Sequence, residues 1–165
     1  MCLRIILPRM DISKSPVASE DKEQIMRISA RNQLKGTIVE VEEGAVNGIV
    51  TIEIPCGCRV KASITNAAIR DLGLEVGMEA IAVVKASSVM FATDRIPNIS
   101  ARNQLKGKLV EVEEGAVNGI VTIELACGYR VKGSITNAAI RDLGFEDGGD
   151  AVAVFKASEV MVAVE

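Results

Sequence analysis

The stretch ISARNQLKG occurs twice in this chain, at Ile28–Gly36 and again at Ile99–Gly107. Sliding the sequence by 71 residues aligns 28–92 with 99–163, and only 14 of these 65 positions differ. Self-similarity at a fixed offset marks a repeat architecture. We therefore interpret the chain as one unit written twice.

The repeats set the expected domain boundaries. We predict a mobile tail at 1–26, a first barrel at 27–93 and a second barrel at 98–165. The linker between the barrels contains Pro97, whose fixed φ discourages regular structure. The opening stretch MCLRIILPRM has an apolar run that is too short for a signal peptide or a membrane span, so we expect a cytoplasmic protein.

The composition excludes several classes of function. The formal net charge is −3, with no run of Lys and Arg, whereas a general nucleic-acid partner requires phosphate-neutralising charge. The sequence contains no His, which removes the commonest general base and the commonest metal ligand. Only 2% of the residues are aromatic, which favours a core of Val, Ile, Leu and Ala.

The alternation of apolar and polar residues predicts five strands in each unit. In the first copy they lie at about 34–42, 50–54, 60–64, 80–84 and 89–92. Thr65 or Asn66 can cap a short helix that Gly73 closes. Five strands with a helix after the third is the order of a small OB-like barrel. The predicted fold is therefore all-β, with two tandem five-stranded antiparallel OB-like barrels.

Basic and hydroxyl residues gather at three element ends of each unit. In the first copy Ser29–Asn32 precede the first strand, Thr65 ends the third, and Lys85–Ser87 connect the last two. Two cations, hydroxyls and free backbone amides without a carboxylate suit a tetrahedral dianion, and nothing among them acts as a base near neutral pH. Taken singly, each residue is more often a cap or a solvated side chain. Either one barrel brings the segments together, or a neighbouring copy supplies some of them.

Two other clusters favour structural roles. Cys56-Gly57-Cys58 resembles half of a metal site, but the second copy reads Cys127-Gly128-Tyr129, so the duplicate has lost a ligand. The four cysteines also lack the spacing of a disulfide framework. The cluster of Glu40, Glu42 and Glu43 is typical of a solvated strand face rather than of a hard-cation site.

The motifs in combination resemble the molybdate-binding Mop domain, also called the TOBE domain. They are ISARNQLKG, EEGAVN, SIT before a short helix that ends in LG, and AVVKAS before Val89. Two copies in one chain resemble the di-domain molbindins, which are cytoplasmic proteins that store or buffer molybdate. The resemblance covers about 26–164. It implies an OB-like barrel, assembly into trimers, and molybdate or tungstate bound as an oxyanion at interfaces.

The resemblance also implies which residues bind the anion. They are Ser29, Ala30, Arg31, Thr65, Lys85, Ala86 and Ser87 in the first copy, and Ser100, Ala101, Arg102, Thr136, Lys156, Ala157 and Ser158 in the second. A further class of site in the family lies near the threefold axis, and Asn47 and Asn118 are the weaker candidates for it. No direct bond from a protein atom to the metal is expected.

The leading hypothesis is a non-enzymatic protein that binds, stores and buffers molybdate, and tungstate is a possible second ligand. We expect a homo-oligomer, a trimer by resemblance, with neither nucleic acid nor membrane as a partner. One alternative is a molybdate-sensing regulatory or assembly subunit of another protein. A weaker alternative is an OB-type nucleic-acid module, which requires stacking aromatics and a basic groove that these repeats lack.

Overall fold

The structure is a computed structural model, and it describes residues 26–165. The tail predicted at 1–26 lies outside this range apart from Met26. The first repeat forms β1 (Asn32–Glu43), β2 (Asn47–Glu53), β3 (Arg59–Thr65), α1 (Asn66–Asp71), β4 (Glu79–Val84), η1 (Ala86–Ser88) and β5 (Met90–Ala92). The second forms β6 (Asn103–Glu114), β7 (Asn118–Glu124), β8 (Arg130–Thr136), α2 (Asn137–Leu143), β9 (Asp150–Phe155), η2 (Ala157–Glu159) and β10 (Met161–Ala163).

The first strand of each repeat is long because it pairs with two strands in succession. Residues 32–37 of β1 pair with β4, and residues 37–43 pair with β2, both antiparallel. A register shift between Ile38 and Glu40 marks a β-bulge, which bends the strand and increases its twist. β6 has the same shift between Leu109 and Glu111. This bend lets each sheet coil into an OB-like barrel.

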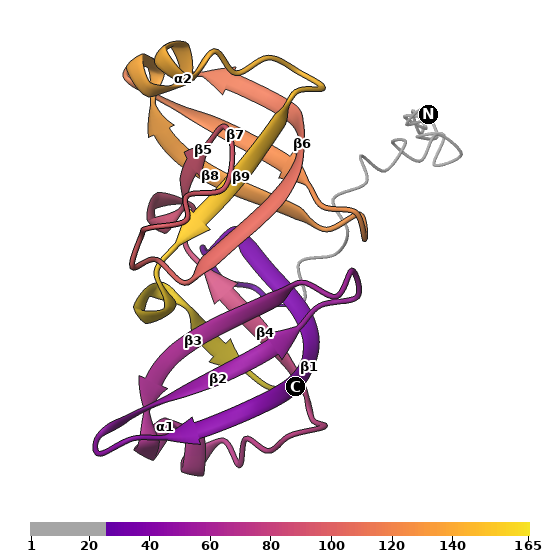
Figure 1. Cartoon of the computed structure of the whole chain (residues 1–165), viewed down its shortest axis with the longest axis vertical. Coiled ribbons are helices and arrows are strands. Elements are labelled where there is room, and N and C mark those ends of the chain that lie inside the picture. Colours follow the sequence, from indigo (N-terminus) through magenta and orange to yellow (C-terminus); the bar gives the residue numbers. More distant parts are fainter. Residues whose placement is uncertain (1–25) are drawn as a thin grey trace, which may run out of the picture.

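Each sheet takes its last strand from the other repeat. The strand orders are β10-β4-β1-β2-β3 and β5-β9-β6-β7-β8. β10 pairs with β4 through Met161 opposite Val83, and β5 pairs with β9 through Met90 opposite Val154. Figure 1 shows the yellow end of the chain returning to the lower barrel, which holds β1–β4. The two repeats are therefore joined by an exchange of strands as well as by the linker.

The differences between the repeats match this exchange. Phe91 of β5 lies against Gly133 of β8, so closely that a Cβ at Gly133 would overlap the ring. The equivalent positions are Val162 in β10 and Ala62 in β3, two strands that also contact each other. The sheet with the glycine therefore receives the strand with the larger side chain, and the sheet with the alanine receives the strand with the smaller one. Phe91 also packs edge-to-face on Phe145, with ring centroids 6.2 Å apart at 88°. Gly133 thus leaves the space in the second barrel that Phe91 of β5 fills.

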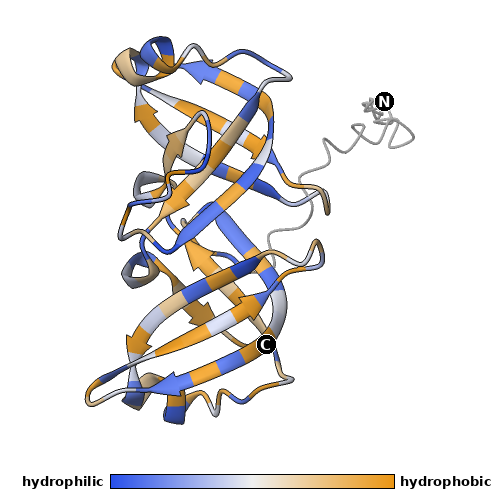
Figure 2. Ribbon diagram, in the orientation of Figure 1, coloured by the Kyte–Doolittle hydropathy of each residue, from blue (hydrophilic) through white to orange (hydrophobic). Residues whose placement is uncertain are grey.

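The exchange merges the interiors of the barrels. One cluster of buried residues includes Leu34 and Ile52 from the first repeat and Leu105 and Phe155 from the second. Apolar and polar residues alternate along strands such as β3, which therefore present one face to this core (Figure 2). β4 and β9 are instead apolar and buried on both faces after their first residue. Smaller clusters around Ile81 and Val152 cover the opposite faces of β4 and β9.

The predicted all-β fold is confirmed, including five strands and a helix after the third in each repeat. Of the two predicted caps, Thr65 is the one that caps α1, since its hydroxyl accepts a hydrogen bond from the Ala68 amide at 3.1 Å. The alternation along each repeat predicts a barrel built from its own five strands. Instead β5 and β10 cross over, because each follows a short 3-10 turn that directs it to the neighbouring sheet.

We predict that Gly133→Ala destabilises the protein because the added methyl group overlaps the Phe91 ring. Overpacking of this kind costs about 1–3 kcal/mol of unfolding free energy. Phe91→Val in the same chain should recover most of that loss, since it recreates the pairing of Ala62 with the smaller Val162. Urea unfolding of both single variants and of the double variant measures the coupling.

The Phe91→Val single variant is the control, because it opens a cavity that the methyl group of Gly133→Ala would partly fill. A double variant whose loss equals the sum of the two single losses would contradict the packing of β5 into the second barrel.

Candidate oxyanion-binding site

The pairing of β1 with β4 brings two distant segments together. Asn32 is opposite Val84, so the residues before β1 and after β4 emerge at the same end of the sheet. Arg31 precedes that pair and Lys85 follows it. We name the side chains of Ser29, Arg31, Lys85 and Ser87 the first cluster. Both segments carry residues predicted from the sequence, and the strand register places them side by side.

Alternation along the chain exposes the polar members of the first cluster. Ala30 is 3% exposed and packs against Ile81 and Val83 of β4. Ser29 and Arg31, the residues before and after Ala30 in the chain, are both exposed, as expected when successive side chains point to opposite sides. The predicted site residue Ala30 therefore anchors the segment by packing.

The second repeat reproduces this arrangement. Asn103 is opposite Phe155, and Ala101 is 4% exposed against Val152 and Val154. The second cluster comprises Ser100, Arg102, Lys156 and Ser158, of which all four are exposed. Ala86 and Ala157, the remaining predicted residues of these segments, are half-buried within η1 and η2.

Two buried asparagines fix the clusters at the junction between the barrels. The Asn32 side chain donates to the Lys132 carbonyl at 2.8 Å and accepts from the Lys132 amide at 2.7 Å. Asn103 makes the same two bonds with Lys61. β8 and β3 are the edge strands of their sheets, so their outer backbone groups have no neighbouring strand. Each asparagine side chain satisfies one of these backbone amides and one carbonyl. This role of Asn32 could not be predicted from the sequence, because its partner lies in the other repeat.

The two 3-10 helices also meet at the junction. η1 packs along β8 and η2 packs along β3, each in the opposite repeat. The Ser88 hydroxyl donates to the Glu159 carboxylate at 3.0 Å. These two residues occupy equivalent positions, directly after Ser87 and Ser158. The clusters therefore lie near each other, and one carboxylate lies beside the second of them.

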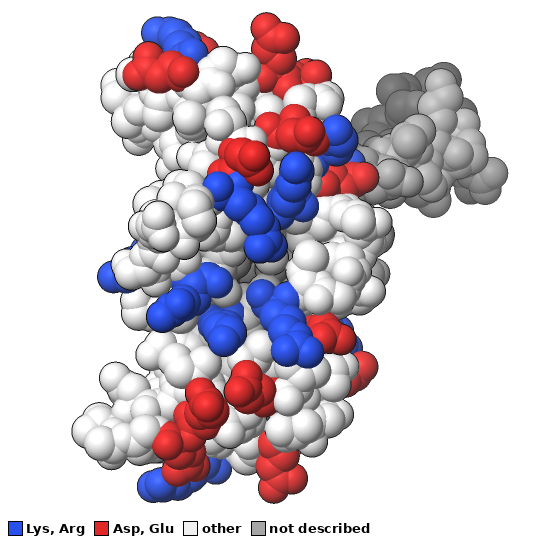
Figure 3. All heavy atoms as spheres, in the orientation of Figure 1, with Lys and Arg blue, Asp and Glu red and all other residues white. Residues whose placement is uncertain are grey.

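The charge distribution favours an anion at this junction. On the face shown in Figure 3, Lys and Arg gather near the middle of the molecule, and Asp and Glu lie mostly toward its two ends. Toward the ends, Arg70 is paired with Glu43 at 2.6 Å and Arg141 with Glu114 at 2.7 Å. Among the described residues, none of the ion pairs includes a cation of either cluster.

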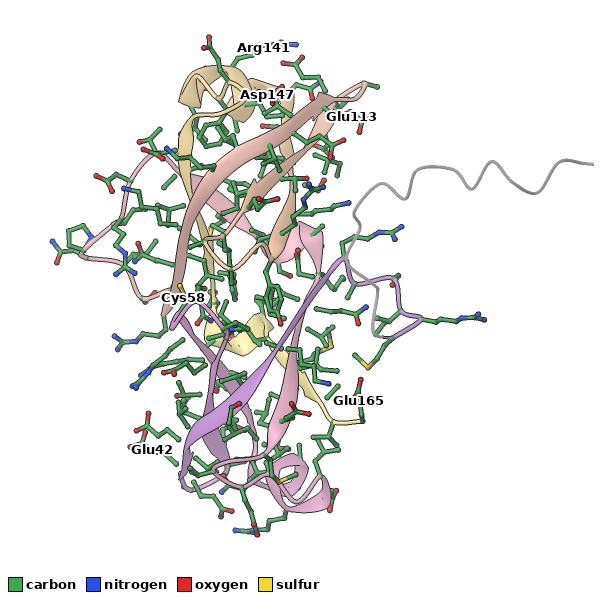
Figure 4. All side chains as sticks on the ribbon, turned by 90° about the vertical axis from the view of Figure 1, so that its right-hand side faces the viewer. Glu42, Cys58, Glu113, Arg141, Asp147 and Glu165 are labelled. Atoms are coloured by element: carbon green, nitrogen blue, oxygen red, sulfur yellow. The ribbon has the colours of Figure 1, made fainter. Side chains whose placement is uncertain are left out.

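Within one chain, the predicted threonines do not join the clusters. Thr65 pairs with Asn47 at the end of the sheet that carries α1, and Thr136 pairs with Asn118 beside α2. Thr136 caps α2 through the Ala139 amide at 3.1 Å. The helices lie at opposite ends of the molecule (Figure 1), and Arg141 of α2 lies near one end in Figure 4. Each threonine is therefore separated from the arginine of its own repeat by most of the length of a barrel.

The clusters that were assigned structural roles hold no metal site in the described part of the chain. Between residues 26 and 165, no three Cys, Asp or Glu side chains converge in a way that would hold an ion. The Glu40 carboxylate instead accepts a hydrogen bond from the Thr51 hydroxyl at 3.3 Å. No helix within the same residues has the length and apolarity needed to cross a membrane.

The fold and the two clusters together define a tandem OB-like protein with duplicated, cation-rich surfaces at its inter-barrel junction (Figure 3). The TOBE domain model matches the chain twice, at residues 28–91 and 99–162. The chain belongs to the TOBE domain family.

Individual relatives are named for molybdenum. The chain is 42% identical over 141 residues to the molybdenum transport protein ModE of Herbaspirillum seropedicae. This alignment covers 85% of the chain and 52% of the relative. It is 37% identical over 140 residues to the molybdenum-pterin-binding protein MopA of Rhodobacter capsulatus, covering 84% of this chain and 53% of the relative. The chain thus spans about half the length of these two relatives.

A solved structure supports the same assignment. The cytoplasmic molybdate-binding protein ModG, crystallised with molybdate bound, superposes with a TM-score of 0.82 at 42% sequence identity. The alignment covers 85% of this chain and 100% of the ModG chain.

Proposed function

We propose that this protein binds molybdate as an intact dianion at the two clusters and stores or buffers it in the cytoplasm without catalysing a reaction. The observation that carries the proposal is the register of β1 with β4, which places Arg31 beside Lys85 without any ion-pair partner among the described residues. The same juxtaposition occurs in the second repeat. The bound molybdate in ModG supports the choice of anion.

The chemistry of the clusters suits an oxyanion with four oxygens. Arg31 and Lys85 donate charge-assisted hydrogen bonds, each worth about 1.5–3 kcal/mol. The hydroxyls of Ser29 and Ser87 rotate to reach the remaining oxygens. We propose that backbone amides of Ala30 and Ala86 complete the shell, and that tungstate, with the same shape and charge, binds in the same way. A chain without His offers no group there that takes up a proton near neutral pH.

We also propose that the protein is a homotrimer, as its resemblance to the molbindins implies. Within one chain Thr65 lies far from Arg31, so a neighbouring copy would have to bring Thr65 or Thr136 to a cluster. Asn47 and Asn118, beside those threonines, are the proposed residues of a threefold-axis site.

A second candidate function is molybdate-dependent regulation of a partner protein. The similarity to ModE, a relative about twice as long as the aligned region, favours it. Affinity capture with and without molybdate distinguishes the two functions. A partner retained only with molybdate supports regulation, and the absence of any molybdate-dependent partner supports storage.

Titration calorimetry of the full chain should show molybdate binding and little response to sulfate at equal concentration. Replacing both Arg31 and Arg102 with Ala should weaken molybdate binding about ten- to a hundred-fold, because each site loses one charge-assisted hydrogen bond.

The matched control replaces the duplicated arginines Arg70 and Arg141, whose ion pairs lie at the outer ends of the barrels. This variant should keep the affinity of the parent protein. Unchanged affinity after loss of Arg31 and Arg102 would contradict the assignment of the clusters, and equal affinity for sulfate would contradict the selectivity for molybdate.

Light scattering should give a particle of three times the 17.5 kDa chain mass. A monomer that binds molybdate tightly would contradict the proposal that neighbouring copies share the sites.

A further inference from the structure

Two equivalent turns carry a cysteine at the same position. In the β2–β3 turn the Gly57 amide donates to the Ile54 carbonyl at 2.8 Å, and in the β7–β8 turn the Gly128 amide donates to the Leu125 carbonyl at 2.8 Å. Cys56 precedes the first glycine and Cys127 precedes the second. Both side chains are half-buried and pack against the shared core. Neither has a role in the proposed anion sites.

The repeats are related by an approximate twofold rotation. Asn32 bonds Lys132 while Asn103 bonds Lys61, which is the exchange of partners expected of an isologous contact. In such an arrangement, residues near the axis meet their own counterparts. The Ser88–Glu159 hydrogen bond between equivalent positions is one example.

The two cysteine turns meet at this junction. The Tyr129 hydroxyl, two residues after Cys127, donates to the Lys35 carbonyl of the other repeat at 3.0 Å. Tyr129 also lines a hollow together with Ile54 and Pro55, the residues before Cys56. In Figure 4, Cys58 of the β2–β3 turn lies at about mid-height, whereas Glu42 and Glu113 lie toward opposite ends.

The two cysteines lie close enough across the junction to interact. The side chain and the backbone of Cys56 both act on the Cys127 thiol. Partial burial is the main cause that raises the pKa of Cys127, and the neighbouring Cys56 thiol raises it further. Burial thus favours the thiol form of Cys127.

We propose that Cys56 and Cys127 are an oxidation site, at which a peroxide converts the two thiols into a disulfide that links the barrels. One sulfur attacks an oxygen of hydrogen peroxide, breaks the O–O bond and becomes a sulfenic acid as the first water forms. The second sulfur attacks the sulfenic sulfur and displaces the second water. The two thiols together lose two electrons and two protons, which reduce one peroxide to two waters.

A bridge between Cys56 and Cys58 is the competing reaction, and Cys58→Ser is the control that prevents it. It is separated from Cys56 by one residue, and its counterpart in the second repeat is Tyr129, so it has no equivalent partner across the junction. A bridge between Cys56 and Cys127 would restrain movement of one barrel against the other at the place where both clusters lie.

The full chain, treated with hydrogen peroxide, can be denatured without reductant, digested with trypsin and analysed by mass spectrometry. Cleavage after Lys35, Arg59, Lys108 and Arg130 leaves Cys56 and Cys58 in one peptide and Cys127 in another. The expected product joins these two peptides in the parent protein and in Cys58→Ser. It should be lost in Cys56→Ser and in Cys127→Ser.

Non-reducing electrophoresis should show that the cross-linked protein runs as a single chain. The oxidised parent protein should also melt at a higher temperature than its reduced form, because the bridge restricts the unfolded chain. Cys127→Ser should show no such increase. A bridge within the Cys56–Cys58 peptide, a cross-link between chains, or overoxidised thiols without any bridge would overturn the proposal.

Discussion

The exchange of the last strand between repeats is the constraint on which the rest of the structure depends. β10 completes the sheet of the first repeat, and β5 completes that of the second. Both strands bring apolar side chains into the other barrel, so the two interiors become one core. A single repeat of this size has little core of its own. Each barrel is therefore completed by its neighbour, and the two cannot separate without breaking both sheets.

The same exchange explains the position of the candidate site. The chain crosses the junction each time it leaves one barrel for the other. η1 connects β4 to β5 there, and η2 connects β9 to β10. Each carries the Lys and Ser of a cluster, and the start of the neighbouring strand β1 or β6 supplies the Ser and Arg. The buried Asn32 and Asn103 tie those starts to the opposite barrel. Buried residues with structural roles thus alternate with the exposed residues of the cluster within the same four-residue stretch.

The sequence predicts most of the local structure but not the exchange. Alternating apolar residues and the Thr65 cap predict the strands and the helix, because these signals depend on neighbours along the chain. Whether β5 pairs within its own repeat cannot be decided from alternation, since the two repeats present nearly identical sheet edges. The signal lies in the few differing positions, where Phe91 matches Gly133 better than Ala62. The proximity of Cys56 to Cys127 could not be predicted either, because it too depends on how the two repeats meet.

Anomalous diffraction at the molybdenum absorption edge, from crystals of the full chain grown with molybdate, tests the location of the anion most directly. The strand register predicts peaks at the junction, one beside Arg31 and Lys85 and one beside Arg102 and Lys156. Peaks confined to the outer turns at Asn47 and Asn118, or crystals without any peak, would contradict the account.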